Sequence, residues 1–279
     1  MNVAIVCNEQ KDRDYEVTEK LIRKLDELKM GICTDVAALH TFCSSVDVCS
    51  TEEAFERADV ILTVGGDGTI LKAAQLASAL DKPILGINMG RVGFMAEIEP
   101  HELGLLDRLL SGDYIIEQRM MLQVYIERDG EACYRVDALN DAVISHGAIS
   151  RMIDITIYNK NEFITEYCAD GVIFSTPTGS TAYSVAAGGP VVDPLLKTIL
   201  STPICAYSLT TKPILFHSSA DLTVRLNNVG AVPYLTVDGS VNHKLQETDV
   251  IHIKKSERTT KLIKFKDVSF YDILAKKLK

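Results

Sequence analysis

The chain has 279 residues, of which 47% are hydrophobic, and its 29 basic and 38 acidic side chains give a formal net charge of −9. This length suits two domains with hydrophobic cores. The acidic balance and the absence of tryptophan argue against a general nucleic-acid-binding protein.

The amino-terminal residues, the lengths of the apolar runs and the cysteines indicate the cellular compartment. The first ten residues lack a basic flank and a cleavage site, so no signal peptide is expected, and no apolar run is long enough for a transmembrane span. The seven cysteines are irregularly spaced, without a C-x-x-C pair. They predict reduced, mostly buried thiols in a cytoplasmic protein, with no structural metal site.

Strands and helices are expected to alternate in the first part of the chain. Short apolar runs predict strands at 2–7, 60–64 and 83–88, and helical periodicity or composition predicts helices at 15–28, 52–58, 70–80 and 101–110. Alternation of this kind is typical of a parallel sheet with helices on its faces. Ligands of such sheets bind at the carboxyl ends of the strands, where the glycine-rich segments 65–69 and 88–93 follow.

From Tyr114 to about Val237 the pattern is mostly strand-like. Strands are expected at 121–127, 132–136 and 153–158, hairpin turns at 129–130 and 159–161, and one helix at 179–187. Residues 270–279 predict a short basic amphipathic helix that docks on the first domain.

These elements predict two domains. The fold class is an α/β amino-terminal domain with a parallel Rossmann-like sheet, followed by a β-rich, sandwich-like carboxy-terminal domain, with the last helix returning to the first domain. The predicted boundaries are residues 1–116 plus about 264–279 for the first domain and 117–263 for the second.

Residues 65–69, Gly-Gly-Asp-Gly-Thr, join the buried strand 60–64 to the helix expected at 70–80. Glycines let an anion approach the backbone, and amides at a helix start suit phosphate. The carboxylate of Asp67 would repel a phosphate unless a metal lay between them or the carboxylate acted on a hydroxyl that accepts the phosphoryl group. The motif therefore favours phosphoryl transfer, although Gly-Asp-Gly is also ordinary turn chemistry. Neither the Walker motif nor the dinucleotide fingerprint matches.

A second dense stretch runs from 169 to 184, where a strand leads through a hydroxyl-rich turn into the expected helix. Uncharged hydroxyls suit ribose and amide edges of a nucleotide. The residues concerned are Thr176, Thr178, Ser180, Thr181 and Ser184. The alternative is a strand–turn–helix whose serines and threonines cap the helix, which is the better interpretation for any single threonine here.

Together the two stretches resemble the NAD kinase family. The matching segments are 65–69, 170–184 and Gly188-Gly189-Pro190, with further matches at 86–94 and 140–141, so that the resemblance spans roughly residues 60–240. The glycine motif alone is shared with diacylglycerol and sphingosine kinases and, more loosely, with phosphofructokinases. The run Thr-Pro-Thr-Gly-Ser-Thr-Ala-Tyr at 176–183 is far more specific.

The resemblance implies ATP-dependent phosphorylation of the 2′-hydroxyl of the adenosine ribose of NAD, giving NADP. Asp67 would be the catalytic base, taking the proton late because a carboxylate cannot ionise a ribose hydroxyl beforehand. Asn140 and Asp141 would bind the adenosine part. The other nucleotide-binding positions that it implies are Gly66, Gly68, Lys72, Asn88, Arg151, Cys168, Asp170, Thr178, Thr181, Ala182, Tyr183, Ser184, Val185, Ala186, Ala206 and Ser240.

The resemblance also implies a magnesium ion, bound mainly through ATP phosphates, and a homodimer or homotetramer. Two positions depart from the family pattern: Asp141 stands where Glu is commoner, and Cys168 stands where a basic residue is common. These departures leave open the preference between NAD and NADH.

Three other functions compete with this interpretation. A lipid or sphingoid-base kinase would share the glycine motif but needs an apolar acyl pocket, which the hydroxyl-rich run disfavours. A non-catalytic NAD-binding sensor is disfavoured by the intact Asp67, and an NAD-dependent dehydrogenase lacks its fingerprint.

Overall fold

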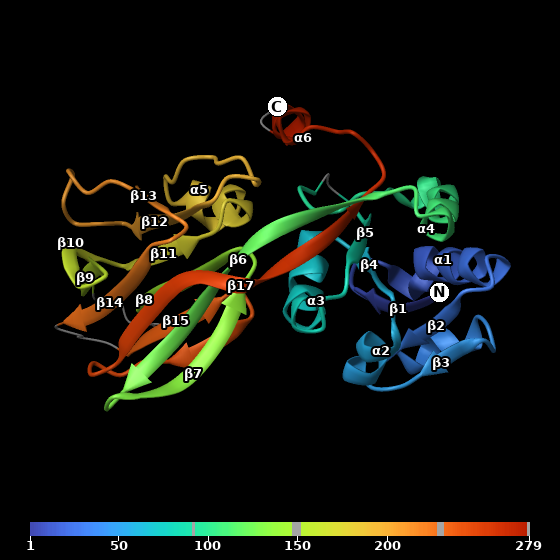
Figure 1. Ribbon diagram of the computed structural model, residues 1–279, viewed down its shortest axis with the longest axis horizontal. Helices are drawn as coiled ribbons and strands as arrows, with labels where there is room; N and C mark the ends of the chain where they lie inside the picture. The colour runs from blue at the N-terminus through green and yellow to red at the C-terminus, as the bar shows by residue number, and fades with distance from the viewer. Residues whose placement is uncertain (91–92, 147–151, 228–231, 278–279) are drawn as a thin grey trace. The chain divides into compact units, whose positions relative to one another are not determined.

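The computed structural model describes the whole chain except residues 91–92, 147–151, 228–231 and 278–279 (Figure 1). It divides into two compact units, Met1–Gln118 with Thr260–Lys279 (unit 1) and Arg119–Thr259 (unit 2). The chain passes between the units inside two long strands, β6 (Ile115–Arg128) and β17 (Val250–Lys264). The sequence placed these boundaries at 116/117 and 263/264.

Unit 1 contains a parallel sheet in the order β5-β4-β1-β2-β3, and the end of β17 joins β5 in parallel where Leu262 pairs with Ile84 (Figure 1). The strands are β1 (Asn2–Cys7), β2 (Gly31–Thr34), β3 (Val46–Val48), β4 (Val60–Gly65) and β5 (Ile84–Asn88). All residues of β4 are buried. The predicted parallel α/β architecture is confirmed; the short strands β2 and β3 were not predicted.

The helices of unit 1 are α1 (Glu16–Glu27), α2 (Thr51–Arg57), α3 (Asp67–Ala79), α4 (Asp107–Ser111) and α6 (Phe270–Lys277). The apolar stripe of α1 is buried in the core of the unit. Helix α3 begins three residues before the predicted start, because Gly66 serves as its cap and Asp67 occupies the first turn, where an acid is favourable. The helix predicted at 101–110 is instead a 3₁₀ segment, Pro100–Leu106, followed by α4.

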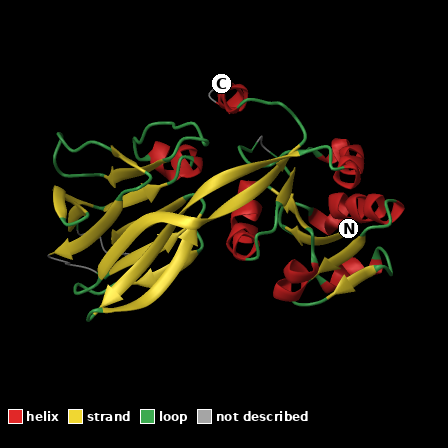
Figure 2. Ribbon diagram, viewed as in Figure 1, coloured by secondary structure: helices red, strands yellow, loops and turns green. Residues whose placement is uncertain are grey.

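Unit 2 is built mainly of strands, which are yellow in Figure 2, and these strands belong to two β-sheets. In one, β10-β9-β14-β17 are neighbours and β6 pairs with β17 and β7; the other has the order β13-β12-β11-β8-β15-β16. The remaining strands are β7 (Glu131–Ala138), β8 (Asp141–His146), β9 (Ile153–Asn159), β10 (Glu162–Ala169), β11 (Gly171–Ser175), β12 (Thr198–Ile204), β13 (Ile214–His217), β14 (Asp221–Asn227), β15 (Pro233–Val237) and β16 (Val241–Lys244). This confirms the predicted β-rich second domain.

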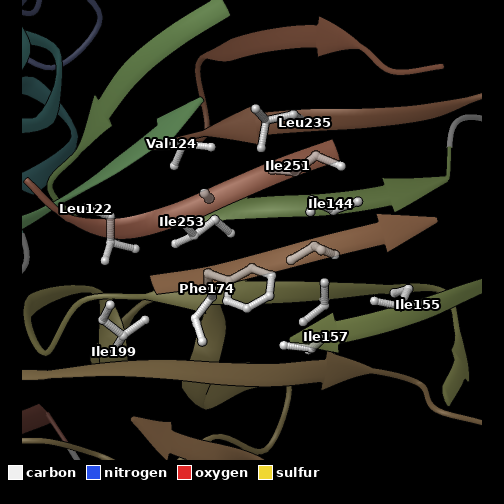
Figure 3. Packing of buried hydrophobic residues seen from close by; sticks show 14 of the residues in the cluster. Leu122, Val124, Ile144, Ile155, Ile157, Phe174, Ile199, Leu235, Ile251 and Ile253 are labelled. Carbon is white, nitrogen blue, oxygen red and sulfur yellow. The ribbon is translucent and has the colours of Figure 1, made fainter. Parts of the chain in front are cut away.

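The core of unit 2 is built from inward-facing side chains of both sheets (Figure 3). Phe174 on β11 is fully buried among aliphatic residues from β6, β8, β9 and β17. The core residues alternate along each strand, so their side chains lie on one face of the sheet. The sheet core therefore fixes β8 and β11, whose ends carry the predicted nucleotide-binding residues.

Both predicted hairpin turns of unit 2 are present. Asp129 and Gly130 have φ values of 53° and 84°, and Lys160 and Asn161 have 49° and 70°, as a type I′ turn requires. The helix predicted at 179–187 is shorter. A 3₁₀ turn, Thr178–Thr181, is separated from α5 (Tyr183–Ala186) by Ala182, whose backbone is not helical (φ −99°, ψ −123°).

All seven cysteines are free thiols. The prediction that most of them are buried is wrong, because only Cys33 is buried. Cys133 on β7 is exposed, and so is Cys205, a loop residue with a φ of 47°. Among the described residues, no helix has the length and hydropathy needed to cross a membrane.

Candidate active site

Asp67 stands at the junction of β4 and α3, where the backbone of a second glycine loop holds its carboxylate. Oδ2 accepts a hydrogen bond from the Phe94 amide (2.9 Å) and Oδ1 accepts one from the Met95 amide (3.1 Å). Gly93 packs so closely that an added Cβ would overlap Oδ1. The amide of Met89 also donates to the Gly65 carbonyl (2.5 Å). The structure thus joins the two glycine loops and fixes the orientation of a half-buried carboxylate.

A cavity of about 620 Å³ opens beside Asp67. Its described lining residues are Lys11, Gly66, Asp67, Gly68, Met89, Gly90, Gly93 and Lys277. The first amides of α3 have no acceptor within the helix, and together with the glycine backbone they suit an anion. Asp67 is the one acidic side chain among these described lining residues.

Sequence reasoning missed two lysines in the cavity lining, Lys11 and Lys277. Lys11 follows β1, which is the direct neighbour of β4 in the sheet, so the strand order would have indicated it. Lys277 lies at the end of α6, and the predicted return of the last helix to the first domain was the only available signal.

The other predicted residues of unit 1 differ in their placement. Asn88, at the end of β5, is 3% exposed; its Nδ2 donates to Glu99 Oε1 (2.9 Å), and its buried Oδ1 has no partner among the described residues. Lys72 is exposed on α3 and is not among the described residues that line the cavity.

A second cluster of predicted residues surrounds Asn140 and Asp141 at the start of β8 in unit 2. One carboxylate, that of Asp238, accepts hydrogen bonds from the amides of Leu139, Asn140 and Asp141 at 2.8, 2.7 and 3.1 Å. Oδ1 of Asn140 is buried and has no partner among the described residues, although buried polar atoms are normally satisfied. An unsatisfied acceptor beside a buried acid makes this cluster a candidate for ligand contact.

Hydrogen bonds connect the turn after β11 to this cluster. Thr176 donates through Oγ1 to the Leu139 carbonyl (2.6 Å) and through its amide to the Asn140 carbonyl (2.9 Å), and its Oγ1 accepts from the Gly179 amide (3.0 Å). Thr178 is 6% exposed, and its Oγ1 accepts from Arg119 Nη1 (3.3 Å).

Several hydroxyls of the hydroxyl-rich run form hydrogen bonds within the protein. Ser180 bonds both the carbonyl and the amide of Val192, and Ser184, which is fully buried, pairs with Thr202 (2.9 Å). These two hydroxyls therefore bond within the protein, but they do not cap a helix, because neither the 3₁₀ turn nor α5 has a side-chain cap. The half-buried or exposed members of the run are Thr181, Ala182, Tyr183, Val185 and Ala186.

The remaining predicted positions are spread over unit 2. Asp170, between β10 and β11, pairs with His146 (3.4 Å), and Ser240 is exposed in the turn between β15 and β16. The Cys168 carbonyl accepts from the Tyr207 amide (2.9 Å), so the loop containing Ala206 lies against β10. Arg151 lies outside the described residues.

Histidine, cysteine and carboxylate side chains do not gather around a common point in groups of three or more anywhere in the described part of the chain. A magnesium ion usually takes one or two carboxylates, with phosphate and water completing its coordination. The carboxylate of Asp67, in a cavity whose described lining suits phosphate, fits that pattern.

Stability should depend on pH through Asp141. Burial, and secondarily the charge of Asp238, raises the pKa of Asp141 to about 7, whereas an aspartate in an unfolded chain titrates near 3.9. Because the folded state binds the proton more tightly, this contribution to stability is fully present below about pH 4 and is lost as the pH rises through about 7. Between about pH 5 and about pH 8, the wild type should lose on the order of 3 kcal/mol of its free energy of unfolding through this group. Urea unfolding of Asp141→Asn should show a smaller loss over the same pH range.

Asp267→Asn, at an exposed carboxylate of unit 1, is the matched control and should leave the pH dependence unchanged. The same pH dependence in Asp141→Asn as in the wild type would contradict this prediction.

Comparison with known proteins identifies the family. Residues 3–114 match the model of the ATP-NAD kinase N-terminal domain, and residues 139–265 match that of the ATP-NAD kinase C-terminal domain. The NAD kinase of Thermoanaerobacter sp. (strain X514) is 37% identical over 278 residues, covering 99% of this chain and 98% of that protein. The NAD kinase of Moorella thermoacetica is 40% identical over 280 residues, covering 99% and 89%.

Two solved structures are similar over nearly the whole chain. Yeast NADH kinase complexed with NADH has a TM-score of 0.87 at 25% identity, covering 99% of this chain and 85% of that one. An NAD kinase from Archaeoglobus fulgidus in complex with ATP has a TM-score of 0.77 at 26% identity, covering 100% and 98%. With both domain models matched in order and full-length relatives at this identity, the chain belongs to the ATP-NAD kinase family.

Proposed function

We propose that the protein transfers the terminal phosphoryl group of ATP to the 2′-hydroxyl of the adenosine ribose of NAD, with Asp67 as the catalytic base. The observation that carries the assignment is the carboxylate of Asp67, held by two backbone amides beside a glycine-lined cavity. Membership of the ATP-NAD kinase family, and the NADH and ATP complexes of the similar structures, support the choice of substrates.

The chemistry asks for positioning and charge compensation more than for covalent catalysis. The amides of Phe94 and Met95 hold Asp67 in one orientation, so that it can align the acceptor hydroxyl and take its proton as the bond to phosphorus forms. A bound magnesium ion, held mainly by the donor phosphates, would offset the negative charge of those phosphates and of Asp67.

We assign the acceptor dinucleotide to unit 2. The buried and unsatisfied Oδ1 of Asn140 is the best candidate for a contact with the adenosine part, and Asp141 lies beside it. Thr181, in the turn that is hydrogen-bonded to Asn140, and Tyr183, the first residue of α5, have polar side chains that are at least partly exposed. Ser184 contributes packing in this proposal, because its hydroxyl is already paired with Thr202.

We also propose a cellular location and an oligomeric state for the enzyme. Seven free thiols support a cytoplasmic location. Large apolar side chains are exposed in the loops and edge strand of unit 2 that surround β12, which supports self-association as a homodimer or homotetramer. These are Leu195, Leu196, Tyr207, Leu209 and Leu215.

One assay tests the reaction. The purified protein is incubated with ATP, magnesium and NAD, and NADP is detected with an NADP-specific dehydrogenase. NADP formation that depends on ATP is expected. A protein that phosphorylates sphingosine or diacylglycerol and forms no NADP would be a lipid kinase, and one that binds NAD without turnover would be a sensor; either result would overturn the proposal.

A further inference from the structure

Two ammonium groups from opposite ends of the chain border the cavity beside Asp67. Lys11 follows β1, and Lys277 ends α6. The Nζ of Lys11 lies over the glycine loop, since a Cβ added to Gly66 would come within 2.6 Å of it. The Nζ of Lys277 lies 4.0 Å from the centre of the Phe94 ring.

The position of Lys11 follows from the topology of the sheet. β1 lies between β2 and β4, so that the chain first builds the sheet in one direction and then returns to extend it in the other. Ligands of open α/β sheets bind at the carboxyl ends of the strands where the order reverses. Lys11 follows the carboxyl end of β1 at that point, and Gly66 follows the end of β4.

Both lysines keep their charge uncompensated in the described structure. Neither ammonium group forms a salt bridge or a hydrogen bond with another described residue, and the contact of the Lys277 ammonium is with the face of an aromatic ring, which orients it without neutralising it. The described lining therefore has two positive charges and one negative charge, that of Asp67. A linear phosphate chain carries the complementary charge, and lysine binds phosphate as a point charge.

Phe94 connects Lys277 to the proposed base. Its amide donates to Asp67 (2.9 Å), while its ring contacts Phe270 of α6 (centroids 5.6 Å apart) and the ammonium of Lys277. The same residue therefore positions the carboxylate and docks the helix that carries the second lysine.

We propose that Lys11 and Lys277 bind the phosphate chain of the phosphoryl donor, with Lys11 over the glycine loop and Lys277 supplied by α6. This inference rests on the proposed function for the nature of the donor, but it concerns binding and not turnover. Lys11 and Lys277 are binding residues, and Phe94 is a positioning residue.

The test measures binding of magnesium β,γ-imido-ATP by calorimetry to the full-length protein, its Lys11→Gln and Lys277→Gln variants and the double variant. We expect each single variant to raise Kd about tenfold and the double variant considerably more. The Kd for NAD should change less than about twofold, and the Lys→Arg variants should restore most of the affinity. Inorganic tripolyphosphate should compete with the analogue in the wild type and compete less well in the double variant.

The chain offers matched controls, Lys276→Gln on α6 and Lys20→Gln on α1, both exposed lysines outside the cavity lining. An unchanged Kd for the analogue in the double variant, or an equal loss of affinity in the controls, would overturn the inference. Because the binding measurement needs no turnover, a protein that binds the analogue through these lysines but forms no NADP would count against the proposed reaction alone.

Discussion

Replacing Asp67 by Asn is expected to lower kcat by about 10²–10⁴-fold, with a much smaller change in the Kd for NAD. The substitution keeps the size of the side chain but removes the group that accepts the proton. It also turns an NH2 group toward one of the two backbone amides that now donate to the carboxylate, so the loop at Phe94 and Met95 loses one hydrogen bond. The measurement is steady-state formation of NADP, with NAD binding followed separately.

Thermal unfolding distinguishes a chemical effect from a structural one. Asp67→Asn should retain a cooperative unfolding transition, because Asp67 is a half-buried residue after the carboxyl end of β4 and does not belong to the hydrophobic core. Asp59→Asn is a suitable control: that carboxylate accepts from the Asn2 amide at the opposite end of β4 and should leave kcat unchanged. Full turnover in Asp67→Asn would rule out the assigned role.

The second large effect is expected at Gly179. An added Cβ would overlap the Asn140 carbonyl oxygen and come within 2.5 Å of its carbon and 2.7 Å of its Cα. These are backbone atoms, and they cannot move without disturbing the bond from the Thr176 amide to the same carbonyl. Gly179→Ala should therefore destabilise unit 2 by about 1–3 kcal/mol or more and weaken NAD binding at least about tenfold.

Urea unfolding and calorimetric titration with NAD measure the two effects of this change. Gly104→Ala is the matched control, because a Cβ there meets nothing within 4 Å. Wild-type stability and affinity in Gly179→Ala would show that the turn after β11 can move away from β8 without loss, contrary to the proposed nucleotide contact.

Local patterns predicted the parts of the site that depend on neighbouring residues. The apolar run of β4 followed by glycines located Asp67, and the parallel strands β4 and β5 placed the two glycine loops at one sheet edge. The predicted fold class is confirmed for the same reason, because alternation and hydrophobic periodicity are properties of short segments.

The features of the site that the sequence did not predict depend on contacts between residues far apart in the chain. Asp238 bonds amides that lie 97 to 99 residues earlier, and no pattern near Asp238 indicates them. Lys11 needs the strand order, and Lys277 needs the docking of α6 on Phe94. The hydroxyls of Ser180 and Ser184 were predicted as a group with their neighbours, but which of them point inward is decided by the packing of the turn.

The division of unit 1 into two separate stretches of chain affects the order of folding during synthesis. Unit 2 is one continuous stretch, Arg119–Thr259, whereas the core of unit 1 includes Ile263 and Phe265 from the last twenty residues. A nascent chain therefore has every residue of unit 2 before unit 1 can bury its last core side chains or pair β17 with β5. A ribosome that stops shortly after Thr259 would release a chain whose amino-terminal half still exposes apolar surface, although that half was made first.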